Sequence, residues 1–157
     1  MPRTLSRGND GMADRPAKET VLAALDAIYS RDAAGAATFY HDDVEYIGYA
    51  PIEFFPGMGF KRGKADLMSA VTSLHQRYSS MRHEIEFIAA EDDTVATLLR
   101  VHMRKQENAR IVQFQVANFF RLKDGLIAQQ RQFIDSFDVL QQVMEVDLGE
   151  LLARLRR

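Results

Sequence analysis

The chain of 157 residues contains no cysteine, so disulfides, zinc–thiolate sites and thiol nucleophiles are excluded. No apolar run approaches the roughly 20 residues of a membrane-spanning helix, and we therefore expect no membrane partner. Residues 1–15 are polar and glycine-bearing, without the apolar centre of a signal peptide. The cytoplasm is therefore the expected compartment.

An excess of either charge is also missing. The formal net charge is -2, and the hydrophobic content of 46% with 27% charged residues is ordinary for a globular protein. Nucleic-acid binders usually carry a basic surface, and this chain has none overall. Its closest feature is the C-terminal group Arg154, Arg156 and Arg157, which we interpret as a solvated helix end. We expect no nucleic-acid partner.

The length predicts one domain whose hydrophobic core is large enough to fold without disulfides or bound metal. Residues 1–15 are expected to be a disordered lead, with Met12 as an alternative start. The domain itself is expected to span residues 16–145. Leucines at helical spacing predict a helical tail over residues 146–157.

The first half of the domain has helical spacing. A helix is predicted to open at Pro16, whose missing N–H costs nothing in a first turn. A short second helix is predicted after Asp32, which suits a cap, and a third after Gly63. Between the last two lie a short predicted strand at 44–49 and an aromatic loop at 51–63, long enough to form a pocket wall.

From Arg82 onward the apolar period changes to two, which predicts strands. Short polar turns separate them and favour an antiparallel meander. Helices followed by a meander indicate the α+β class, with helices covering one face of the sheet. The predicted strands are 83–90, 94–105, 110–122 and 126–137.

Asn118 interrupts one of these strands. Its neighbours at every second position are apolar, so one amide lies within an apolar stripe. A buried polar group without partners costs roughly 1–3 kcal/mol, so a protein group, a water or a ligand must meet it.

The strand at 94–105 has one apolar and one polar face. Arg100 and His102 belong to the polar face. By themselves these residues favour exposure to solvent. The alternative is a cleft beneath the helices, where histidine would act as an acid–base group near neutral pH.

The last strand and the remaining histidines give weaker signals. Arg131 and Asp135 are about 13 Å apart along an extended strand and need separate partners. Ion pairing or exposure is favoured over catalysis for both. No histidine pair has metal-ligand spacing, and we predict neither a metal nor a cofactor.

The order of these elements and several short motifs resemble the nuclear-transport-factor-2-like superfamily. This cone-shaped α+β fold, also called cystatin-like, includes ketosteroid isomerase, limonene-epoxide hydrolase and SnoaL-like polyketide cyclases. The resemblance covers roughly residues 16–144. Its motifs are SRD at 30–32, FYHDD at 39–43, RG at 62–63, FFRLKDG at 119–125 and the closing stretch 131–138.

The resemblance to ketosteroid isomerase places Asn118 where that enzyme has an acid that hydrogen-bonds the substrate oxyanion. An amide also donates such a bond, without a raised pKa. The isomerase's general-base aspartate would fall near Gly48, and its oxyanion tyrosine near Ala24. Both groups are missing here, which argues against steroid-type isomerisation.

The epoxide hydrolases resemble this chain at Arg100, while their nearby aspartate is replaced by His102. Their first-strand tyrosine is similar to Tyr46. Their second catalytic aspartate would correspond to Gln132, so both carboxylates that activate water are absent. The resemblance to the SnoaL-like group makes Asp135 a candidate acid–base residue.

The resemblance implies that Arg100, His102 and Asn118 all face the interior of the cone. The apolar face of the same strand, with Leu99, Val101 and Met103, would then need cover on the outer side. A homodimer would supply it.

Two functional hypotheses remain open. The first is an isomerase, cyclase or hydrolase acting on a small apolar substrate with a carbonyl or other polar oxygen, with His102 or Asp135 moving a proton. The second is a non-catalytic ligand-binding or dimerisation module, which a pocket filled by Phe54, Phe55 or Phe60 would favour. The predicted ligand-binding residues are Tyr46, Arg100, Phe114, Val116, Asn118, Phe120, Gln132 and Ile134.

Overall fold

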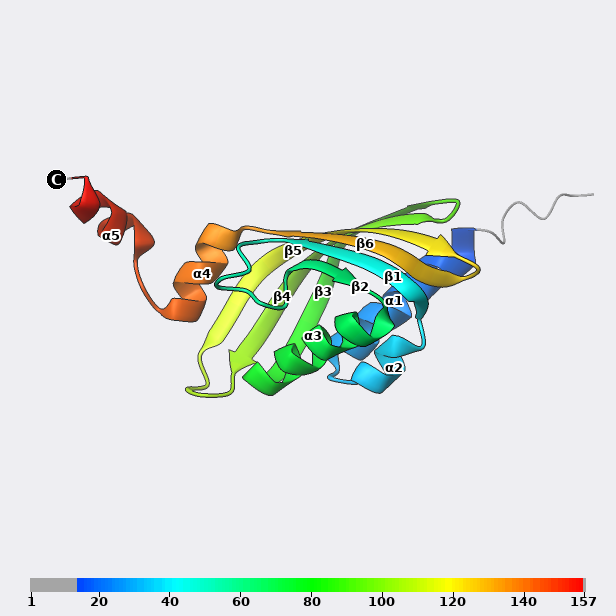
Figure 1. The fold of residues 1–157 in the computed structure, drawn as a ribbon, viewed down its shortest axis with the longest axis horizontal. Coiled ribbons are helices and arrows are strands. Elements are labelled where there is room, and N and C mark those ends of the chain that lie inside the picture. The colour runs from blue at the N-terminus through cyan, green and yellow to red at the C-terminus, as the bar shows by residue number, and fades with distance from the viewer. Residues whose placement is uncertain (1–13, 157) are drawn as a thin grey trace, which may run out of the picture.

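A six-stranded sheet with helices on one face forms the body of the molecule (Figure 1). The computed structural model describes residues 14–156, with side chains from residue 17 onward. Residues 1–13 of the predicted lead at 1–15 and the alternative start at Met12 lie outside this part, whereas residues 14–15 belong to the first helix. The elements are α1 Asp14–Tyr29, α2 Ala33–Ala37, β1 Tyr40–Tyr49, β2 Gly59–Arg62, α3 Lys64–Arg77, β3 Tyr78–Glu91, β4 Thr94–Lys105, β5 Ile111–Lys123, β6 Leu126–Ile134, α4 Ser136–Met144 and α5 Leu148–Leu155.

The strand order is β2-β1-β6-β5-β4-β3. Strands β3 to β6 form the predicted antiparallel meander, and β1 joins it by pairing parallel to β6. The predicted turn before β6 is confirmed, with Asp124 and Gly125 both at positive φ, as a tight hairpin requires. The α+β prediction is therefore confirmed.

Helices α1, α2 and α3 lie on one face of the sheet, which we call the inner face (Figure 1). A buried His75 ties two of them together, because its Nε2 is 2.7 Å from the Ile28 carbonyl at the end of α1. Arg31, at φ 65°, donates to the carbonyls of His75 and Ser79. Within residues 14–156 no helix is long and apolar enough to cross a membrane.

Strand register decides which side chains face the helices. Leu99 and Val101 are fully buried on the inner face, opposite Val116 and Phe114 of β5. The expectation that the apolar face of β4 needs cover from outside is therefore wrong. Burying that face against α1 removes the apolar surface from water within one chain.

The outer face of the sheet carries a different apolar group. These aromatic side chains are between 40% and 57% exposed. Three of them contact one another, with ring centroids 4.2 Å apart for Tyr49 and Phe133 and 5.9 Å for Phe119 and Phe133. We call this group the outer aromatic patch, and it consists of Tyr49, Phe60, Phe87, Phe119 and Phe133.

Two further elements differ from prediction. The stretch 51–63 was predicted to be a loop throughout, whereas 59–62 form the edge strand β2 against β1. The last strand was predicted to reach residue 137, but it ends at Ile134 and helix α4 follows. Periodicity at the end of that strand was misleading because Phe133 and Phe137 also fit a strand face.

Candidate functional site

A cavity of about 190 Å³ lies between the inner face of the sheet, α1, α3 and α4. Most of its wall is aliphatic or aromatic. Two exposed residues, Phe54 and Arg77, also belong to the wall, so the cavity opens to solvent at that end. The wall consists of Leu25, Ile28, Tyr29, Tyr40, Tyr46, Phe54, Phe55, Gly57, Met58, Leu67, Ala70, Val71, Leu74, Arg77, Tyr78, Met103, Phe114, Val116, Asn118, Gln130, Gln132, Ile134, Val139 and Val143.

A chain of hydrogen bonds orients Asn118, which is 1% exposed. The Tyr40 hydroxyl donates to Gln130 Oε1 at 2.9 Å, so the other end of that amide, Nε2, faces Asn118. Gln130 Nε2 donates to Asn118 Oδ1 at 3.0 Å, which in turn directs Asn118 Nδ2 to Thr97 Oγ1 at 3.4 Å. The amide of Asn118 is held at its oxygen, while its nitrogen has one long bond.

A second polar pair lies beside the first. The Tyr46 hydroxyl donates to Gln132 Oε1 at 2.5 Å and contacts Met58 Sδ at 3.2 Å. Gln132 lies directly opposite Asn118 on the neighbouring strand. The hydrogen-bonded groups of these two sets thus come mainly from three adjacent strands, β1, β6 and β5.

Gly48 shows why the expected general base is missing. A Cβ at this position would lie 2.6 Å from the Tyr46 hydroxyl and 2.7 Å from Met58 Sδ. These two side chains occupy the space that an aspartate side chain would need. An aspartate at this position would therefore require Tyr46 and Met58 to move.

The ionisable groups in the wall are neutral at ordinary pH, apart from Arg77. Burial raises the pKa of Tyr29, Tyr40 and Tyr46 far above the usual tyrosine range. Within residues 14–156, no Asp, Glu or His side chain lines the cavity. The interior therefore provides uncharged hydroxyl and amide groups.

The prediction that Arg100 and His102 face the interior is wrong. In a strand, alternate side chains point to opposite faces, and Thr97, not Arg100, lies opposite Asn118. On the outer face, Arg100 Nε donates to Glu86 Oε1 at 2.7 Å. The solvent-side interpretation, which the residues alone favoured, agrees with the placement of Arg100. The His102 side chain on the same face is only 17% exposed, and its Nε2 lies 3.9 Å from Glu84 Oε1.

Asp135 also lies outside the cavity wall. It is the N-cap of α4, where its Oδ1 accepts a hydrogen bond from the Asp138 backbone N–H at 3.1 Å. Phe120 is buried in the core and is not part of the wall. The predicted residues that do line the cavity are Tyr46, Phe114, Val116, Asn118, Gln132 and Ile134.

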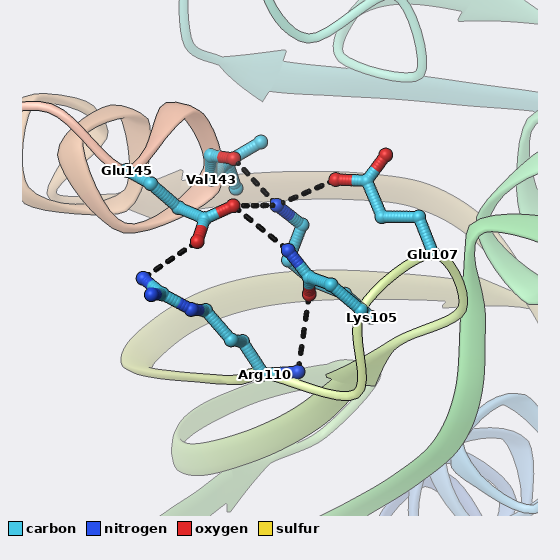
Figure 2. A network of polar contacts seen from close by, with 6 residues as sticks. Lys105, Glu107, Arg110, Val143 and Glu145 are labelled. Carbon is cyan, nitrogen blue, oxygen red and sulfur yellow. Dashed lines mark hydrogen bonds and ion pairs between the residues drawn. The ribbon is translucent and has the colours of Figure 1, made fainter.

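Helix α4 forms one wall of the cavity through Val139 and Val143. A polar network at its C-terminal end fixes it to the β4–β5 hairpin (Figure 2). Lys105 Nζ donates to the Val143 carbonyl at 2.9 Å and to Glu145 Oε2 at 3.1 Å, and pairs with Glu107 at 2.9 Å. The side chain of Lys105 is only 8% exposed and that of Glu145 28%, whereas Glu107 is 71% exposed, so the bonds to α4 are better shielded from water than the pair with Glu107.

Sequence reasoning missed several wall residues. Gln130 had a usable signal, because it alternates with Gln132 and Ile134 on the inner row of β6. Tyr40 lay outside the strand predicted at 44–49, because β1 begins earlier, at Tyr40 itself. Arg77 had no signal, since a basic residue in the last turn of a helix is ordinary.

Comparison with known proteins identifies the family. The SnoaL-like domain model matches residues 21–130, so the chain belongs to the SnoaL-like domain family. A search of curated proteins found no match.

Solved structures share the fold. A protein proposed to be an isomerase from Rhodopseudomonas palustris is 22% identical, with a TM-score of 0.74 over 86% of this chain and 100% of its own. An LEH-like epoxide hydrolase from M. tuberculosis is also 22% identical, with a TM-score of 0.69 over 90% and 98%. A protein proposed to be a SnoaL-like polyketide cyclase from Jannaschia sp. CCS1 is 15% identical, with a TM-score of 0.74 over 94% and 99%.

Proposed function

We propose that this SnoaL-like protein binds a small, largely apolar molecule that carries a carbonyl or another polar oxygen. The amide nitrogen of Asn118 carries the proposal. An amide nitrogen has two N–H groups, and the protein partner of this one is a hydroxyl 3.4 Å away. Asn118 lines the cavity, so a ligand oxygen placed there would receive the remaining donor. Apolar walls with a few convergent polar groups are typical of small-molecule sites.

The state of the aromatic residues favours a ligand site over a dimerisation module with a filled pocket. Phe54 and Phe55 form part of the wall and leave the cavity open. Phe60 lies on β2 and is 57% exposed, away from the cavity.

An isomerase- or cyclase-type reaction is the second candidate. It is favoured by the same Asn118 donor, because an N–H group directed at a carbonyl oxygen in an apolar site stabilises the enolate that forms when a neighbouring proton leaves. His102 and Asp135 lie outside the cavity, so a water molecule inside the cavity, beside the bound carbonyl, would accept that proton. Exchange of α-hydrogens of a bound ketone in heavy water, accelerated by the wild type and not by Asn118→Leu, is the expected result.

Binding is tested with two probes of similar shape, benzylacetone and butylbenzene, which differ by a carbonyl. Each competes with N-phenylnaphthylamine, a dye that fluoresces in apolar cavities. The wild type is expected to bind benzylacetone about tenfold more tightly, and Asn118→Leu to lose this preference. Gln129→Leu, an exposed amide on β6 outside the cavity, is the matched control and should retain it.

Two outcomes would count against the proposal. If neither probe displaces the dye, the cavity is not a binding site for such molecules. If Asn118→Leu keeps the preference for the ketone, Asn118 is not the donor.

A further inference from the structure

We infer that the ligand of this cavity carries an anionic group, a carboxylate in the simplest case, which Arg77 binds at the open end. This inference rests on the proposed function, because it describes another part of the ligand that Asn118 would bind. It makes the ligand amphiphilic, with an apolar body inside and one negative charge outside.

Arg77 lies where two hollows meet. It belongs to the wall of the inner cavity and also to a surface groove that runs over the start of β2 and along α3. Gly57 is the loop residue shared by both, and a Cβ on Gly57 would lie 3.7 Å from Arg77 Nη2. Because Gly57 has no side chain, it leaves the guanidinium uncovered where the two hollows share these residues.

In the part of the chain that the structure describes, the charge of Arg77 has no counter-ion. Among residues 14–156, no carboxylate lies within 4.0 Å of its guanidinium, in contrast to Arg100, which is 2.7 Å from Glu86. The inner cavity contains no acid either, and its tyrosines are neutral. Guanidinium groups bind carboxylates through two parallel N–H bonds, which suits an anion entering from the groove.

The groove beyond Arg77 also favours a negatively charged ligand. Its charged residues are Lys61 and Arg77 against Asp66, so its net charge is positive. Ser69 and Ser73 of α3 add hydroxyl groups along it. Lys61 Nζ also donates to the Pro56 carbonyl at 3.1 Å, which holds the loop that contains Gly57.

The test compares phenylbutyrate with phenylbutyramide, which share an apolar body and differ in charge. Both compete with N-phenylnaphthylamine at low salt. Because Arg77 is exposed, we expect a preference of about three- to fivefold for the acid, which decreases as salt is added. Arg77→Gln should bind both probes equally, whereas Arg121→Gln, an exposed arginine of β5 outside both hollows, should keep the preference.

A second variant tests the space between Gly57 and Arg77 without changing any charge. Gly57 is not at positive φ, so Gly57→Leu is sterically allowed for the backbone and places a side chain against Arg77. This variant should weaken the binding of phenylbutyrate more than that of benzylacetone, because benzylacetone fits within the inner cavity.

Each outcome separates this inference from the proposed function. Equal affinity of the wild type for the acid and the amide, or an unchanged preference in Arg77→Gln, overturns the inference while the benzylacetone preference still stands. The inference is also overturned if benzylacetone binds but neither phenylbutyrate nor phenylbutyramide binds. If benzylacetone fails to bind as well, the proposed function and this inference fail together.

Discussion

Removing the Tyr40 hydroxyl should weaken the fold through the amides that orient Asn118. Tyr40→Phe leaves the ring in place and removes the donor to Gln130 Oε1, a bond of 2.9 Å between residues that are 1% and 5% exposed. A buried acceptor that loses its donor costs about 1–2 kcal/mol in the free energy of unfolding. For a domain of this size, Tm should fall by about 3–6 °C.

Tyr29→Phe is the matched control for this prediction. Tyr29 is also buried and lines the same cavity, but among residues 14–156 its hydroxyl has no hydrogen-bond partner. Its ring stacks on His83 with centroids 4.8 Å apart, and phenylalanine keeps that contact. Urea unfolding followed by circular dichroism should show a change within about 0.5 kcal/mol.

A double-mutant cycle tests whether the chain of hydrogen bonds acts as a unit. Tyr40 and Asn118 are joined through Gln130, so Tyr40→Phe and Asn118→Leu should be coupled by about 0.5–1 kcal/mol. Equal unfolding free energies for Tyr40→Phe and Tyr29→Phe, together with strictly additive effects in the cycle, would refute the reasoning.

Three further outcomes are expected. Burial raises the pKa of the buried tyrosines in the folded state, so above the unfolded pKa of about 10 the unfolded chain loses protons that the folded chain keeps. The free energy of unfolding should then fall by about 1.4 kcal/mol per pH unit for each such tyrosine. Tyr29→Phe should reduce this slope in alkaline unfolding. Lys105→Met should release the end of α4, with amide exchange there about tenfold faster and weaker benzylacetone binding, whereas Lys123→Met should change neither. The outer aromatic patch should mediate a homodimer, so Phe133→Asp should give a monomer in sedimentation equilibrium while the wild type gives a dimer.

The strands of the meander were predictable because each alternates over nine residues or more. Strand β4 has the predicted bounds, and the stripe containing Asn118 is the inner row of β5. Alternation also assigned Leu99 and Arg100 correctly to opposite faces. It gave no sign of which face is inner, and the family resemblance led to the wrong choice for Arg100 and His102. The apolar row was the better guide, because burial of Leu99 and Val101 outweighs any placement of two charged side chains.

The rest of the site depended on contacts that no local pattern contains. Asn118 acquires its orientation from Tyr40, which is 90 residues from the Gln130 that links them. Helix α4 was missed because its N-cap, Asp135, also fitted the strand pattern. The position of Arg77 at the cavity could not be predicted, because it depends on the loop with Gly57 that packs beside it in the fold.

The packing around Gly48 accounts for one difference from ketosteroid isomerase, the absence of its general-base aspartate. Restoring an aspartate at Gly48 would bring its side chain against the Tyr46 hydroxyl and Met58 Sδ, at 2.6 Å and 2.7 Å from the new Cβ. Tyr46 would have to move, and with it the bond to Gln132. The space that a catalytic carboxylate needs is used instead to hold neutral hydrogen-bonding groups. A cavity with this construction suits recognition and polarisation of an oxygen, and any proton transfer in it depends on groups that the wall does not supply.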